Sequence, residues 1–357
     1  MRFVPMAVLA LAFPVLAAEK AAEPEIDWID GRNVPIEGRA FADTKNYYER
    51  LPAEAEGRVT EAVWYLQAHT SGLMFRFRTD SPTLWIEWDL IGRDELATGH
   101  QPSAGKSGFD FYQRGKDGRL RFRRSFPPTA QTGNRGSVAN VPGQECLFNF
   151  PLYNGVKSCR IGVVKGSKIE AVPRKAKPIV FYGVSTTQGA SASRPGMSFP
   201  AIIGRRLERP VVNLGFSGAG KMEMEMCDYL ARIDAELYVL DMPGNMSLQL
   251  MEERYEKFVR ELHRRRPDVP MVFAGERIYC SDGGPDKKTA FLADLISKLE
   301  SEKDAGWSLA LVRSSEMFPK EVDETAVDSP GGHPGDLGMM ELADAFQAKI
   351  APLLLSR

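Results

Sequence analysis

The sequence predicts an α/β protein in which a parallel sheet with helices on both faces follows an all-β domain of the sandwich or jelly-roll type. Residues 58–172 show short runs with period-two alternation, separated by turn residues, as antiparallel strands do. Residues 178–357 alternate apolar strands with amphipathic helices, which is typical of a parallel sheet covered on both faces. The 357 residues, 43% of them hydrophobic, are enough for two cores.

The N-terminus has the pattern of an export signal, and we expect residues 1–18 to be a signal peptide. Arg2 precedes an apolar run over residues 3–16, and Ala17 and Ala18 follow as small residues. The alternative, a buried N-terminal helix, is disfavoured because polar sequence follows at once. The run is too short to span a bilayer, and no later segment is long and apolar enough to do so. The sequence therefore predicts a periplasmic or secreted protein without a membrane span.

Charge and cysteine content exclude several classes of partner. Lys and Arg total 46 against 47 for Asp and Glu, a net charge of -1, so no nucleic-acid partner is expected. The four cysteines form no Cys-x-x-Cys pair, and no two His have ligand spacing, so we expect neither a metal nor another cofactor. Cys146 and Cys159 flank an expected hairpin, which leaves two alternatives in an exported protein: a cross-link, or two buried thiols.

The β-rich domain is expected to cover residues 19–172. In residues 73–80, Phe75 and Phe77 alternate with arginines, and residues 83–90 place Leu84 and Ile86 on one face and Trp85 on the other. Such an exposed aromatic could stack on a sugar, although packing against the sheet is the alternative. Further strands are expected at 108–114, 119–124, 146–150 and 159–164.

A short linker at residues 173–177 is expected to lead into the second domain, residues 178–357. Strands are expected at 178–183, 210–215, 236–242, 269–275 and 307–312. Helices are expected at about 198–207, 248–266, 287–302 and 334–354. In a parallel sheet, functional residues gather beyond the carboxyl ends of the strands.

Four segments beyond expected strands carry the groups of a serine-esterase site: GVSTTQG (183–189), NLGFSG (213–218), PGNM (243–246) and GGHPGD (331–336). Ser185 has the place of a nucleophile, and His333 that of its general base. The backbone N–H of Gly218 and the side-chain amide of Asn245 could stabilise an oxyanion. Taken singly, each has an ordinary explanation: a helix cap, a glycine turn or a solvated loop histidine.

These segments resemble the SGNH (GDSL-like) hydrolase superfamily, in particular its two-domain bacterial branch with a β-sandwich before the esterase domain. The resemblance implies a flavodoxin-like sheet, Ser185 as nucleophile, His333 as base, and Gly218, Asn245 and the Ser185 N–H as oxyanion donors. The family usually places its triad acid three residues before the His, where this chain has Pro330. Asp328 is the nearest substitute. Asp323 and Asp336 fit less well by spacing, and a backbone carbonyl in a Ser–His dyad is a further alternative.

The resemblance further implies an exported esterase that removes acyl groups, acetyl above all, from a carbohydrate. Two alternatives remain: a lipid esterase or thioesterase, and a carbohydrate-binding protein with impaired catalysis. The loops at 186–196 and 276–286 are small and polar, which disfavours a lipid substrate. Arg194, Glu276 and Arg277 lie on these loops and are candidate substrate-binding residues.

Overall fold

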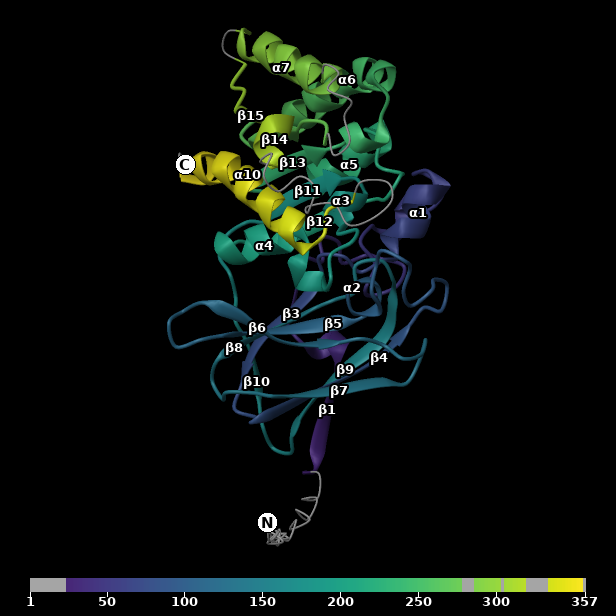
Figure 1. The fold of residues 1–357 in the computed structure, drawn as a ribbon, viewed down its shortest axis with the longest axis vertical. Helices are drawn as coiled ribbons and strands as arrows, with labels where there is room; N and C mark the ends of the chain where they lie inside the picture. The colour runs from purple at the N-terminus through teal and green to yellow at the C-terminus, as the bar shows by residue number, and fades with distance from the viewer. Residues whose placement is uncertain (1–23, 278–285, 303–304, 319–332, 356–357) are drawn as a thin grey trace, which may run out of the picture.

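The structure is a computed structural model that describes residues 24–277, 286–302, 305–318 and 333–355. Its strands form two antiparallel sheets in the first half of the chain and one parallel sheet in the second, as Figure 1 shows from bottom to top. The predicted signal peptide, Asp323, Asp328 and Pro330 lie outside the described residues.

The antiparallel strands pack as a sandwich. Within the described residues, one sheet has the order β1-β9-β4-β7 and the other the order β10-β3-β8-β5-β6, with β2 paired to β3. The strands are β1 (Ile26–Asp30), β2 (Ile36–Glu37), β3 (Met74–Thr79), β4 (Thr83–Leu90), β5 (Phe109–Arg114), β6 (Leu120–Phe126), β7 (Asn134–Ala139), β8 (Glu145–Asn149), β9 (Val156–Val164) and β10 (Ile169–Ala171). Phe75 and Phe148 of one sheet share a core with Ile86 and Ile161 of the other, as the period-two alternation predicts.

Cys146 and Cys159 are free and buried, so the cross-linked alternative is wrong. The expected hairpin between them is wrong as well, because β8 and β9 belong to different sheets. The Cys146 thiol lies 3.1 Å from Asn140 Oδ1, and the Cys159 thiol lies 3.2 Å from the Tyr48 hydroxyl. Burial raises the pKa of both thiols to about 12, so both stay protonated.

Two other expectations for this half need correction. Trp85 does face away from Leu84 and Ile86, but it is only 5% exposed and so offers no free ring for a sugar. A Cβ on Gly162 would lie 3.0 Å from Trp85 Cβ and 3.1 Å from the Trp28 ring, so both tryptophans crowd over this glycine. The period-two region also contains two short helices, α1 (Glu61–Gln67) and α2 (Ser103–Lys106).

The second half has the predicted parallel sheet, in the order β12-β11-β13-β14-β15. Its strands are β11 (Ile179–Gly183), β12 (Val211–Gly215), β13 (Leu237–Asp241), β14 (Met271–Ala274) and β15 (Leu309–Val312). All neighbouring strands are parallel, with Gly183 in register with Gly215 and with Asp241. This flavodoxin-like order places a topological switch point at the carboxyl end of β11, next to Ser185.

Helices cover both faces of this sheet (Figure 1). They are α3 (Ser185–Gln188), α4 (Phe199–Arg206), α5 (Met224–Arg232), α6 (Leu248–Arg265), α7 (Lys287–Glu300), α8 (Ser314–Met317) and α10 (Asp336–Leu355). The buried faces of α5, α6 and α7 share one core with the sheet, and those of α4 and α10 share the other. Phe41, Leu51 and Val63 from the N-terminal half belong to the first of these cores, so the two halves pack together. None of the helices in the described ranges has the length and apolar composition needed to cross a membrane.

Candidate active site

Ser185 and His333 meet at the carboxyl edge of the parallel sheet. The Oγ of Ser185 lies 2.7 Å from Nε2 of His333, although the two residues are 148 positions apart in the chain. Ser185 is the first residue of α3 and is separated from the end of β11 by Val184 alone, whereas His333 lies three residues before α10. Both side chains are half-buried. The contact joins a hydroxyl to an imidazole nitrogen that can take its proton.

The turn that carries Ser185 requires a close approach to β12. A Cβ on Gly215 would lie 2.3 Å from the backbone N of Gln188, so only glycine lets α3 sit against the end of this strand. Asn213 Nδ2 donates to the Thr187 carbonyl at 2.7 Å and ties the same two elements together. Ser185 is therefore held by buried backbone contacts.

Gly218 and Asn245 lie on the loops that follow β12 and β13. Gly218 has a φ of +69°, is exposed, and would have no neighbour within 4 Å of an added Cβ, so its backbone faces open space. Asn245 Nδ2 donates to the Gly220 carbonyl at 3.1 Å and to the Phe216 carbonyl at 3.3 Å. The amide thus braces the loop that bears Gly218.

The helix-cap explanation for Asn245 is not supported, because another residue caps α6. The Ser247 side chain accepts a hydrogen bond from Leu250 N at 3.2 Å. The Asn245 amide is instead directed toward the Gly218 loop.

The second ring nitrogen of His333, Nδ1, faces away from Ser185 and is the atom to which a triad acid binds in serine hydrolases. Nδ1 is buried and has no hydrogen-bond partner among the described residues. Asp336 Oδ1 and Oδ2 accept from the backbone N and Oγ of Ser193, at 2.9 and 2.6 Å, so its carboxylate is committed elsewhere. Burial lowers the pKa of His333, and the charges of His100 and Arg277 lower it further. These influences favour the neutral imidazole, which is the form that accepts a proton.

The three candidate substrate-binding residues occupy different environments. Arg277 is buried and donates to Asp241 Oδ2 at 2.5 Å, and the Thr187 hydroxyl donates to the same oxygen. Glu276 forms an ion pair with Lys288.

Arg194 and Glu276 are equally exposed, each at 22% of its side-chain area. The Arg194 guanidinium is 3.4 Å from Asp336 and stacks 4.2 Å above the Phe122 ring of the β-sandwich. Arg277 therefore stabilises the buried part of the site through Asp241, whereas Arg194 lies at the margin of the site.

Sequence reasoning missed His100 and Asp241. The His100 ring lies parallel to that of His333, with centroids 5.9 Å apart, so the β-sandwich contributes a side chain to the site. Nothing local in the sequence marks this loop histidine. Asp241 did have a signal: it is the single carboxylate at the end of the apolar run LYVLD, directly before PGNM.

Both halves of the chain match known protein families. Residues 176–351 match the GDSL-like Lipase/Acylhydrolase family. Residues 26–169 match a family described as the N-terminus of SGNH-hydrolase-type esterases. No curated protein matches the chain significantly in sequence.

Solved structures share the fold over nearly the whole chain. A GDSL-like lipase from Bacteroides ovatus ATCC 8483 is 27% identical, with a TM-score of 0.80 over 93% of this chain and 98% of that one. A salicylyl-acyltransferase from a tetracycline biosynthetic pathway is 16% identical, with a TM-score of 0.75 over 92% and 97%. A family two carbohydrate esterase from Cellvibrio japonicus is 12% identical, with a TM-score of 0.58 over 93% and 99%. With both family matches, the chain belongs to the SGNH (GDSL-like) hydrolase superfamily and is an ester hydrolase.

Proposed function

We propose that this protein is an exported serine esterase that removes acyl groups, chiefly acetyl, from a carbohydrate. The 2.7 Å contact between Ser185 Oγ and His333 Nε2 is the observation that carries the proposal. Ser185 is the nucleophile, His333 the general base, and Asp328 the acid that orients His333 through Nδ1. Gly218, Asn245 and the Ser185 N–H are the oxyanion donors.

The reaction follows from these roles. His333 Nε2 takes the proton of Ser185 as the hydroxyl attacks the ester carbonyl, and the oxyanion donors stabilise the negative charge on its oxygen. His333 then gives the proton to the sugar oxygen as the bond between this oxygen and the acyl carbon breaks, so the sugar departs as an alcohol and an acyl-serine remains. A water molecule, deprotonated by His333, attacks this acyl group, and the acid departs as Ser185 regains its proton.

Two features support a carbohydrate as the leaving alcohol. Structures of family two carbohydrate esterases share this two-part architecture. Several described residues at the margin of the site are polar or aromatic, including His100, Ser193 and Arg194 stacked on Phe122. Such side chains suit a hydroxyl-rich ligand better than the long acyl chain of a lipid ester, which would need a wide apolar entrance to the site.

A substrate panel tests this function. We expect the wild type to release acetate from acetylated oligosaccharides with a higher kcat/KM than from acetylated simple alcohols, long-chain lipid esters or thioesters. Acetate release is measured directly, with Ser185→Ala as the inactive control. Preference for the lipid esters or thioesters would contradict the carbohydrate assignment, and no turnover of any ester would contradict the esterase site.

The pH dependence tests the role of His333. Because the pKa of His333 is lowered from its ordinary value of 6.5, the neutral base persists on acidification, and kcat/KM should fall only below pH 6.5. The variant His100→Ala removes both the shielding of His333 from water and the electrostatic effect by which His100 lowers its pKa. Both changes raise the pKa of His333, so the acid limb should move to higher pH. No movement of the acid limb in the variant, measured on a small acetyl ester, would argue against this assignment.

A further inference from the structure

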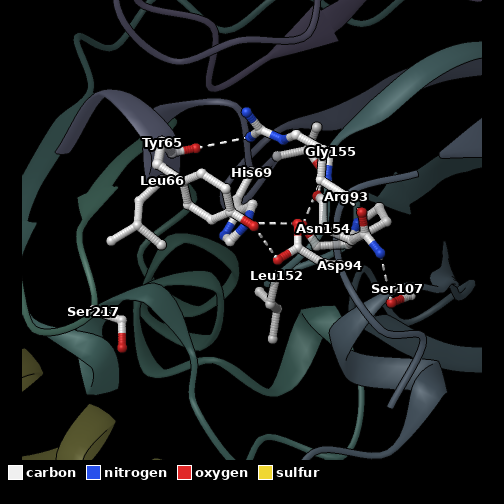
Figure 2. A network of polar contacts seen from close by, with 12 residues as sticks. Tyr65, Leu66, His69, Arg93, Asp94, Ser107, Leu152, Asn154, Gly155 and Ser217 are labelled. Carbon is white, nitrogen blue, oxygen red and sulfur yellow. Dashed lines mark hydrogen bonds and ion pairs between the residues drawn. The ribbon is translucent and has the colours of Figure 1, made fainter. Parts of the chain in front are cut away.

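Side chains of the N-terminal half make buried polar contacts with the two loops that carry Ser185 and Gly218. The Tyr153 hydroxyl donates to the Ser185 carbonyl at 2.9 Å. The Ser71 hydroxyl donates to the Gln188 carbonyl at 2.6 Å, and His69 Nδ1 lies 2.9 Å from Gln188 Nε2. Figure 2 shows His69 and Tyr65 around Asp94, with Ser217 of the Gly218 loop nearby. The β-sandwich therefore reaches the catalytic loops through specific hydrogen bonds.

The hydrogen bonds of Gln188 fix the orientation of its amide and the tautomer of His69. The backbone N–H of Ser217 can only donate, so the amide atom that it meets at 3.0 Å is Oε1. Gln188 Nε2 then faces the Leu152 carbonyl at 3.1 Å, which can only accept, and His69 Nδ1. Nδ1 of His69 must therefore be an unprotonated acceptor.

The same tautomer of His69 determines how its other ring nitrogen contacts Asp94. The proton of neutral His69 lies on Nε2, from which it is donated to Asp94 Oδ2 at 3.2 Å. Asp94 Oδ1 accepts a further hydrogen bond from Tyr65 at 2.7 Å. His69 is 2% exposed, and burial lowers its pKa, which favours this neutral form. A directed chain of donors thus runs from Ser217 N–H through Gln188 and His69 to the Asp94 carboxylate.

A second buried side chain reaches the same loop from the N-terminal half. Arg50 is 2% exposed and donates to the carbonyls of Asn213 at 3.0 Å and Gly215 at 2.8 Å, where β12 ends. Its guanidinium also lies 4.7 Å from the ring centre of Phe216. Burial of the Arg50 charge costs free energy, which its hydrogen bonds to these carbonyls offset in part. The same hydrogen bonds hold the end of β12, from which the Gly218 loop departs.

We propose that His69, acting through Gln188, is a positioning residue for the oxyanion loop. Gln188 lies three residues after the nucleophile and holds the Ser217 N–H, next to the Gly218 N–H. Its amide keeps this orientation because His69 Nδ1 accepts its N–H. The inference rests on the proposed esterase function, and it makes the β-sandwich a component of the catalytic apparatus.

The test compares three full-length variants. His69→Leu removes the acceptor for Gln188, His69→Asn restores an acceptor oxygen near the position of Nδ1, and Thr70→Val is the matched control. Thr70 is adjacent, fully buried, and donates to the Pro151 carbonyl at 2.9 Å. Its replacement therefore removes a buried hydrogen bond within the N-terminal half while leaving the contacts of Gln188 with His69 and Ser217 intact.

We expect His69→Leu to lower kcat on a small acetyl ester by about 10- to 100-fold with KM little changed, since small displacements of catalytic groups cost that much. The inhibition constant of a trifluoromethyl ketone, which forms an oxyanion adduct with the serine, should rise by the same factor. His69→Asn should regain most of both losses, and Thr70→Val should keep the wild-type kcat. Near-UV circular dichroism at the assay temperature measures the folded fraction, to which each kcat is normalised.

Equal kcat and inhibition constants for folded His69→Leu and wild type would overturn the inference while leaving the esterase function intact. A loss in Thr70→Val as large as in His69→Leu would also overturn it, because the effect would then be general destabilisation. If His69→Leu fails to fold, His69→Asn becomes the test variant. A near-wild-type kcat of His69→Asn supports the positioning role of His69, and a loss as large as 100-fold contradicts this role. Wild-type inactivity on all esters would overturn both proposals.

Discussion

Ser185→Ala and His333→Ala are each expected to lower kcat by about 10⁶-fold, as observed where a nucleophile and its base act as one unit. The two side chains share one proton across the 2.7 Å contact, so neither works without the other. The double variant should therefore be no slower than either single variant. The measurement is kcat on an activated acetyl ester, with circular dichroism to establish that each variant folds.

Additive losses in the double variant would show that the two residues act independently and would contradict the proposed pairing.

The same series tests Asp328. Asp328→Asn should lower kcat by about 10⁴-fold if this carboxylate orients His333, as in other triads. Unchanged kcat would instead favour the Ser–His dyad.

Asn245→Ala is expected to lower kcat by about 10²- to 10³-fold, the usual cost of losing one oxyanion donor. The loss should appear in kcat more than in KM, because the donor acts on charge that develops in the transition state. In the free enzyme both N–H groups of the Asn245 amide donate, to the carbonyls of Phe216 and Gly220, so the oxyanion must replace one of these carbonyls as acceptor. Binding of a trifluoromethyl ketone should weaken in parallel with kcat.

Ser247→Ala is the matched control for Asn245. Ser247 caps α6 two residues further along, and losing such a cap costs about 1 kcal/mol of stability. The control should have a lower unfolding midpoint but a wild-type kcat. If Asn245→Ala behaves in the same way, Asn245 has a structural role and is not an oxyanion donor.

The local sequence was sufficient to predict where the catalytic groups would gather. Apolar runs such as residues 178–183 and 236–242 predicted parallel strands, and β11 and β13 are observed there. The carboxyl ends of parallel strands meet at one edge of a sheet, so residues following different strands become neighbours. This rule placed Ser185 at the carboxyl edge of the sheet from the sequence alone.

Some elements escaped prediction because their signals are weak or shared. Helix α1 has only seven residues and lies within a region of period-two alternation. Cys146 and Cys159 have strand patterns that fit either a hairpin or two separate sheets, and only the pairing of β8 and β9 with other strands separates these alternatives.

The sequence by itself determined the succession of strands and helices along the chain and the identity of the groups at the sheet edge, because periodicity and turn residues are local properties. Tertiary structure decided which distant residues support them: His100 beside His333, Asp241 with Arg277, and the network of His69 with Gln188. These contacts depend on how the β-sandwich packs against the parallel sheet. No local pattern encodes such packing, because the partners of the His69–Gln188 pair are 119 residues apart and meet only after both halves have folded.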